Sequence, residues 1–122
     1  MEPQEVSIRA PGSFILIAGS VDVDAPEFDG GPSRLWANAQ CVCVGTLCEI
    51  DGCTRIVIGS GSDHADLTLV FKGEIDTQSE RLVVSDAELN ELIEIAAPSR
   101  RTGLSIWTND AREPTVIAID VT

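Results

Sequence analysis

The sequence predicts an all-β fold, a single-domain antiparallel β-sandwich of about eight or nine strands over residues 1–122, with at most one short helix. Short runs rich in Val, Ile and Leu alternate with polar residues, and turn-forming residues separate these runs at intervals of roughly ten positions. The length is close to the usual size of one domain, and neither an internal repeat nor a change of composition marks a second one.

The first two predicted strands lie on either side of Pro11-Gly12. Residues 6–10 alternate between apolar and polar, and the apolar run Phe14–Ala18 follows the break. Residues 19–34 then combine four acidic side chains with prolines and glycines, which oppose both strand pairing and helix. We expect two strands joined by a short turn, followed by a long acidic loop.

A β-hairpin is predicted around Asp51-Gly52. Residues 37–50 and 53–59 are both rich in β-forming side chains. Asp-Gly between two such runs favours a two-residue type I′ turn, because both central positions need positive φ. This register would pair Cys48 with Arg55 in neighbouring strands.

Further strands are expected over residues 67–71, 81–85, 104–108 and 115–121, where apolar and polar side chains alternate. Segment 86–97 allows two interpretations. Ser85 with Glu88 matches a capping box, and the leucines that follow keep helical spacing. Strict alternation up to Ala97 and the stop at Pro98 favour a strand instead, so we expect a turn over 86–90 and a strand over 91–97.

The charge balance is strongly acidic, with 20 carboxylates against eight basic side chains and a formal net charge of -12. The basic residues are scattered apart from the pair Arg100-Arg101, so no basic stripe is available to bind nucleic acid. A negative surface instead favours encounter with a cationic protein. A halophilic or GC-rich genome, which prefers Asp, Glu and Arg to Lys, is the alternative explanation of this composition.

No run approaches the roughly 18 apolar residues of a membrane span. The first dozen residues lack the basic start and apolar stretch of a secretion signal. We therefore expect a cytoplasmic protein without a membrane partner, in which cysteines stay reduced.

Four cysteines lie within thirteen residues, and four thiolates are able to close a tetrahedral zinc site. In the predicted hairpin, Cys41 and Cys43 face one side of the sheet while Cys48 and Cys53 face the other, because side chains alternate along a strand. We therefore expect packing thiols and neither metal nor cofactor. A β-bulge at Gly45 that brings the four together, or a disulfide, are the alternatives.

Two other segments resemble sites of chemistry. His64, between Asp63 and Asp66, is typical of a metal ligand or general base, but no nucleophile lies nearby, so a solvated loop histidine is the expected role. The acidic loop departs from the alternating oxygen ligands and central glycine of an EF-hand. We predict no catalytic residue, and hence no enzyme.

The acidic loops are the predicted partner-binding surface. Glu27-Phe28-Asp29 places an aromatic side chain between carboxylates, which is typical of an anchor for a basic partner. The candidate contact residues are Asp22, Asp24, Glu27, Phe28, Asp29, Asp63 and Asp66.

The order of the predicted strands is distinctive over nearly the whole chain. Its most characteristic pieces are Glu5-Val6-Ser7-Ile8, Phe14–Ala18, the Asp51-Gly52 turn, the strand ending in Phe71, Arg81-Leu82, Gly103-Leu-Ser-Ile-Trp-Thr108 and Ile119-Asp-Val. This order resembles the competence protein J family, whose members include the inhibitor of a secreted DNA-entry nuclease. The resemblance implies a small acidic β-sandwich that binds and neutralises a basic nuclease and has no catalytic residues of its own.

The functional hypothesis is an acidic inhibitor or immunity-type protein that neutralises a basic partner such as a nuclease. The alternative is a non-enzymatic ligand-binding or structural β-sandwich from an organism with an acidic proteome.

Overall fold

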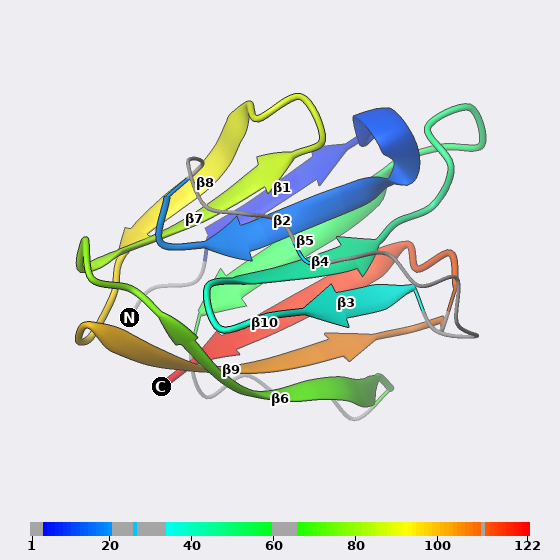
Figure 1. The fold of residues 1–122 in the computed structure, drawn as a ribbon. Helices are drawn as coiled ribbons and strands as arrows, with labels where there is room; N and C mark the ends of the chain where they lie inside the picture. The colour runs from blue at the N-terminus through cyan, green and yellow to red at the C-terminus, as the bar shows by residue number, and fades with distance from the viewer. Residues whose placement is uncertain (1–3, 21–25, 27–33, 60–65, 111) are drawn as a thin grey trace.

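The computed structural model describes residues 4–20, 26, 34–59, 66–110 and 112–122, and in these it contains two five-stranded sheets packed face to face (Figure 1). The elements in chain order are β1 (Gln4–Ile8), the 3-10 turn η1 (Pro11–Ser13), β2 (Phe14–Ala18), β3 (Leu35–Ala37), β4 (Cys41–Gly45), β5 (Thr54–Gly59), β6 (Thr68–Asp76), β7 (Arg81–Asp86), β8 (Glu91–Ala96), β9 (Arg101–Thr108) and β10 (Val116–Val121). The predicted all-β sandwich is confirmed, with ten strands in the described part of the chain. None of the described segments forms a helix long and apolar enough to cross a bilayer.

The first sheet has the strand order β1-β5-β10-β9-β6. Its pairs are antiparallel except for β5 and β10, which run parallel. This parallel pair is a difference from the expected antiparallel sandwich. It joins strands far apart in the sequence, and parallel neighbours cannot be connected by a tight hairpin.

The second sheet has the order β3-β4-β2-β7-β8, and all its pairs are antiparallel. Its edge strand β3 is short, and the sequence pattern did not separate it from the strand expected to begin at residue 37.

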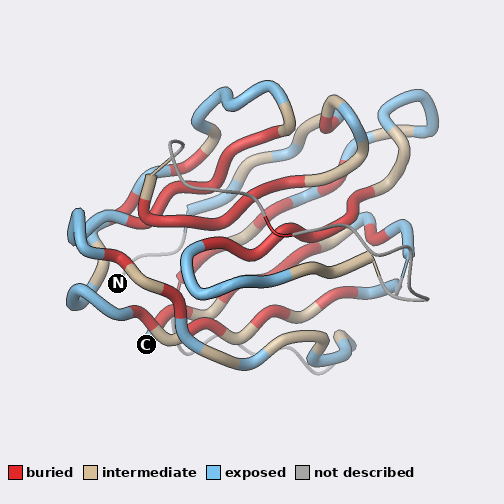
Figure 2. Tube along the Cα trace, in the orientation of Figure 1, coloured by how far each residue is buried: buried red, intermediate tan, exposed pale blue. Residues whose placement is uncertain are grey.

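The hydrophobic core lies between the two sheets (Figure 2). Ile15 and Ile17 of β2 meet Ile56 and Ile58 of β5 in this layer, and all four side chains have no exposed surface. Their spacing of two residues follows from the alternation of side chains along a strand. Each such burial contributes about 1.5–3 kcal/mol of transfer free energy.

A second, smaller apolar cluster occupies the outer face of β2 and β4. Its members are Leu16, Ala18, Cys41 and Cys43, with Phe14 and Trp36 packed against them. Because successive side chains point to opposite faces, these residues lie on the side of the sheet away from the main core. Both faces of these two strands are therefore buried, which accounts for their continuous apolar sequences.

The hairpin predicted at Asp51-Gly52 is wrong, because β4 and β5 belong to different sheets. A turn does form, since the Asp51 N–H donates to the Cys48 carbonyl at 2.8 Å, and Gly52 has a positive φ of 150°. Residues 46–53 nevertheless carry the chain from one sheet to the other. The Asp-Gly signal was correct for a local turn and incorrect for the pairing of the strands around it.

Side-chain and long-range contacts replace the predicted hairpin ladder. The Thr54 hydroxyl accepts from the Leu47 N–H at 3.1 Å and donates to the Pro114 carbonyl at 2.9 Å. Arg55 pairs with Ser7 of β1 and Val116 of β10 instead of with Cys48. β5 thereby gains a neighbour on each side, whereas a simple hairpin supplies one, and both neighbours come from distant parts of the chain.

Segment 86–97 forms the predicted turn and strand. The Asp86 carboxylate accepts the N–H groups of Glu88 at 2.9 Å and Asn90 at 3.0 Å, which closes the turn. Strand β8 follows, and its Ile93 and Ile95 are both buried in the main core. The side chains that face inward are therefore spaced two residues apart, as in a strand, and not at the spacing of a helix.

Candidate functional site

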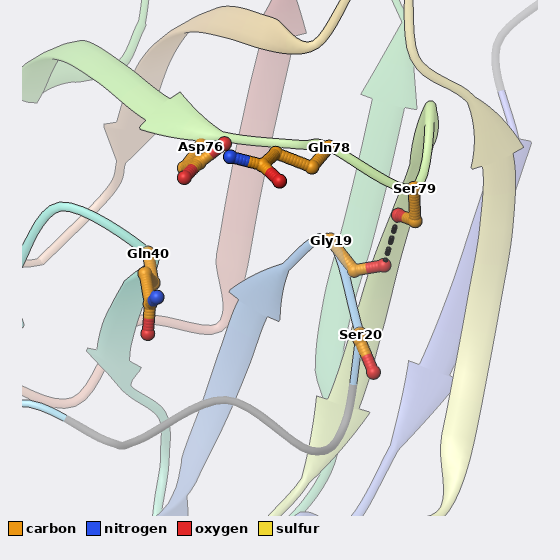
Figure 3. A pocket seen from close by; sticks show the side chains of 6 residues that line it. All are labelled: Gly19, Ser20, Gln40, Asp76, Gln78 and Ser79. Carbon is orange, nitrogen blue, oxygen red and sulfur yellow. Dashed lines mark hydrogen bonds between the residues drawn. The ribbon is translucent and has the colours of Figure 1, made fainter.

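A cavity of about 230 Å³ opens at one end of the sandwich, where the end of β2, the β3–β4 turn and the β6–β7 turn meet (Figure 3). We call it the Asp76 cavity. It is lined by Gly19, Ser20, Gln40, Asp76, Gln78 and Ser79.

Hydrogen bonds hold the walls of the Asp76 cavity together. The Asp76 N–H donates to the Ala39 carbonyl at 2.8 Å, and the Ser79 hydroxyl donates to the Gly19 carbonyl at 2.8 Å (Figure 3). A Cβ at Gly19 would lie 3.2 Å from the Cα of Thr77, so the missing side chain lets the β6–β7 turn approach β2 closely. The three segments are therefore fixed relative to one another.

Thr77 fixes the β6–β7 turn to the segment that leads into β9. Its side chain has no exposed surface, and its Oγ1 lies 2.8 Å from the Ser99 carbonyl and 2.7 Å from the Thr102 hydroxyl. Its backbone N–H donates to the Arg100 carbonyl at 2.8 Å. Asp76, the preceding residue, is consequently held by a buried hydroxyl network and does not sit on a loose loop tip.

The lining of the cavity is polar and carries one negative charge. Asp76 carries the sole formal charge among the lining residues, and no described cation forms an ion pair with it. Figure 3 shows the Gln78 carboxamide extended towards Asp76 with its nitrogen the nearer end, and Gln40 on the other side of the opening. The arginines of nearby strands and turns pair elsewhere: Arg81 with Glu94 at 2.7 Å, Arg100 with Glu80 at 3.6 Å and Arg101 with Glu74 at 3.5 Å.

The opposite end of the sandwich contains a cation of the chain itself. The half-buried Arg34 donates from Nη1 to the Thr46 carbonyl at 3.0 Å and the Arg112 carbonyl at 2.8 Å, and from Nη2 to the Ser13 carbonyl at 2.6 Å. A cavity of about 420 Å³ adjoins it, lined by Arg34, Asp110, Arg112 and Glu113. That cavity is larger, but its charges are of both signs, so it offers less selectivity for a cation than the Asp76 cavity.

The structure describes one of the seven predicted contact residues. Asp22, Asp24, Glu27, Phe28, Asp29 and Asp63 lie outside the described residues, as does His64. Asp66 is exposed and precedes the start of β6, whereas Asp76 is the last residue of that strand. A strand of this length separates them by roughly 25 Å, so Asp66 is not part of the Asp76 cavity.

The residues of the cavity were not identified from the sequence. Asp76-Thr-Gln-Ser79 is a polar run between two strands, which indicates a turn and nothing more specific. Gly19 and Gln40 come from other segments, and no local pattern connects them with Asp76. The cavity is a product of strand order.

The cysteines divide into two pairs. Cys41 and Cys43 share the outer apolar cluster with no exposed surface, as expected of packing thiols. Cys48 is half-buried, and the same expectation is wrong for Cys53, which is exposed in the connection between the sheets. The neighbouring Cys41 thiol and burial raise the pKa of Cys43. Within the described ranges, no group of three or more His, Cys, Asp or Glu side chains is arranged to hold a metal ion.

The fold has a counterpart among solved structures. The chain is similar to the crystal structure of ComJ, inhibitor of the DNA degrading activity of NucA, from Bacillus subtilis, with a TM-score of 0.66 and 15% sequence identity. The similarity covers 99% of this chain and 94% of that chain. No protein-family model and no curated protein sequence matches. The resemblance predicted from the order of the strands is therefore confirmed as a likeness of fold.

Proposed function

We propose that this protein is an inhibitor or immunity-type protein that binds a basic nuclease and blocks the groove into which nucleic acid would enter. The observation that carries the proposal is the likeness of the whole chain to ComJ, an inhibitor of the DNA degrading activity of NucA. The net charge of -12 supports it, because a nuclease groove is built to attract the polyanion that this surface would imitate.

The arrangement of the basic residues supports a protein partner over nucleic acid. Arg34 donates to carbonyl groups of its own chain, and Arg9 donates to the Glu49 carbonyl at 3.0 Å. Four other arginines pair with carboxylates, namely Arg55, Arg81, Arg100 and Arg101. Most of the cationic side chains therefore serve the protein itself and do not form a track for phosphates.

The Asp76 cavity supports binding more than catalysis. Its Ser79 hydroxyl donates to the Gly19 carbonyl, so its proton is not directed to a base that would activate it as a nucleophile. The proposed contact surface includes the Asp76 cavity, and the remaining candidate contacts are those named from the sequence: Asp22, Asp24, Glu27, Phe28, Asp29, Asp63 and Asp66.

A capture experiment with an activity readout tests the proposal. The tagged protein is used to capture partners from its own organism at low and at molar salt, and captured proteins are identified by mass spectrometry. We expect a basic nuclease at low salt and less of it at high salt. Titrating the protein into that nuclease should suppress DNA degradation at a stoichiometric ratio. Capture of no nuclease, or of one that keeps full activity, would reject the proposal.

The role of the acidic loop is tested by neutralising four of its carboxylates, Asp22, Asp24, Glu27 and Asp29. Association with the captured nuclease should slow and depend less on salt, while stability should change by less than about 0.5 kcal/mol per substitution. An unchanged on-rate and salt slope would remove this loop from the contact surface. Unfolding of the wild-type protein at low salt but not at molar salt would instead assign the acidity to a saline cytoplasm.

A further inference from the structure

The lining of the Asp76 cavity carries one negative charge and no positively charged side chain. Asp76 is half-buried at its edge, and the carboxamides of Gln40 and Gln78 and the Ser20 hydroxyl add neutral groups that both donate and accept hydrogen bonds. One carboxylate among neutral hydrogen-bonding groups fits a cation with several N–H donors better than it fits an anion or an apolar group.

The walls of this cavity are formed before any partner arrives. The backbone bond from Asp76 to Ala39 and the side-chain bond from Ser79 to Gly19 are both 2.8 Å long, and the buried Thr77 fixes the turn between them. A site that needs no rearrangement loses less conformational entropy on binding, so even one polar side chain can contribute useful affinity there.

The chain itself contains an example of the recognition that this cavity allows. At the opposite end of the sandwich, the Arg34 guanidinium is held by three carbonyl oxygens from three separate segments. The Asp76 end has the same convergence of three segments and adds a carboxylate, but no described arginine or lysine enters it.

We propose that the Asp76 cavity is a socket for one arginine side chain of the basic protein partner. The inference rests on the proposed function in that it takes the partner to be basic. Asp76 accepts the guanidinium through a charge-assisted bond, and Gln40 and Gln78 accept its remaining N–H groups. A lysine ammonium is a compact donor that cannot reach acceptors on both sides of the opening at once, so arginine is the preferred occupant.

A direct binding experiment uses small probes. Nα-acetyl-arginine amide, its lysine counterpart and the uncharged citrulline counterpart are each titrated to millimolar concentration into 15N-labelled protein. We expect the arginine probe to shift the backbone amide signals of Gly19, Asp76, Gln78 and Ser79, and the other two to shift them much less. Equal shifts with lysine, or shifts spread over the whole acidic surface, would overturn the proposal.

Matched variants connect the socket with the partner. Asp76→Asn keeps the shape and removes the charge, while Glu88→Gln removes an exposed carboxylate from the β7–β8 turn at the opposite end. Asp76→Asn should abolish the arginine-probe shifts and weaken binding of the captured nuclease about tenfold. Glu88→Gln should leave the shifts and change the affinity less than about threefold.

The two proposals fail in different ways. If the nuclease binds and Asp76→Asn affects it no more than Glu88→Gln, the socket is wrong while the inhibitor function stands. If the arginine probe binds at the cavity but no nuclease is captured, the inhibitor function is wrong and the cavity still recognises guanidinium. Unchanged unfolding midpoints for both variants show that neither result comes from loss of the fold.

Discussion

The two ends of the sandwich hold distant chain segments together with different polar groups. At each end, chain segments that are distant in the sequence come together around polar groups. At the Arg34 end, a guanidinium of the chain links the carbonyl groups of Ser13, Thr46 and Arg112. At the Asp76 end, hydrogen bonds of the backbone and of small side chains hold the segments, and no cation in the described part of the chain pairs with the carboxylate.

This difference assigns the Arg34 guanidinium to the stability of the fold and the Asp76 carboxylate to recognition of a partner. A cation that satisfies internal carbonyl groups contributes to folding, because its removal leaves acceptors without a donor. A carboxylate whose neighbours are already held by other bonds contributes little to folding and remains available to an external donor. The comparison therefore predicts large stability effects at the Arg34 end and binding effects at the Asp76 carboxylate.

Arg34→Met should have the largest effect on stability. It removes three hydrogen bonds from one charged group, and we expect a loss of about 3 kcal/mol in the free energy of unfolding, measured by urea denaturation. Arg34→Lys should recover only part of it, because an ammonium cannot donate in the same planar pattern. A loss below that of Asp76→Asn would remove the distinction between the two ends.

Thr77→Val should show that the Asp76 end depends on its buried hydroxyl and not on its charge. The variant keeps the shape but leaves the Ser99 carbonyl and the Thr102 hydroxyl without their shared partner. We expect a loss of about 2 kcal/mol by urea denaturation. Thr77→Ser, which retains the hydroxyl, is the matched control and should stay closer to wild type.

The glycines at the two ends provide a matched pair of close approaches. A Cβ at Gly45 would lie 2.6 Å from the Cβ of Arg34, whereas one at Gly19 would lie 3.2 Å from the nearest atom, the Cα of Thr77. Overpacking of this kind should cost about 2 kcal/mol for Gly45→Ala and about 1 kcal/mol for Gly19→Ala, measured by thermal unfolding. If Gly19→Ala cost more stability than Gly45→Ala, the Arg34 side chain would move aside more easily than its contacts indicate.

The smallest predicted effect is a pH dependence at the Arg34 end. The backbone N–H groups of Glu113 and Arg112 donate to Asp110 and lower the pKa of its carboxyl group. A lowered folded-state pKa contributes stability that is present above the unfolded pKa and is lost as the pH falls through the folded value. The Asp110 carboxyl signal, followed by NMR, should titrate below the usual range.

Asp110→Asn keeps an acceptor oxygen at the same place and removes the titration. The acidic limb of the stability curve should therefore become slightly flatter in this variant than in wild type. An identical curve would show that Asp110 has no part in the acid sensitivity of this end.

Much of the secondary structure was predictable because alternation is a local signal. The strand over 91–97 was distinguished from a helix by its period of two, and the structure buries Ile93 and Ile95 on one face accordingly. The turn after Asp86 and the break at Pro11-Gly12 also appear where the sequence places them. The likeness of fold to ComJ followed from the order of such elements.

The candidate site was less predictable, because its residues share no sequence neighbourhood. The predicted contact residues lie in acidic runs, and of these only Asp66 falls in the described part of the chain, away from the Asp76 cavity. Asp76 itself is a single carboxylate in an ordinary polar turn. Asp76 becomes part of a candidate site because Gln40 and Gly19 line the same cavity, and no local sequence pattern predicts that these three residues lie together.

The sequence by itself determined the all-β class, the positions of most strands and the acidic character of the surface, because each depends on the order of neighbouring side chains or on their sum. The tertiary structure alone decided that β5 lies between β1 and β10, that Asp51-Gly52 turns the chain between sheets, and that the Asp76 cavity exists. Alternation records that one face of a strand is buried, but not which strand covers it or pairs with it. Those choices depend on contacts between residues far apart in the chain, which form only when both sheets close over a common core.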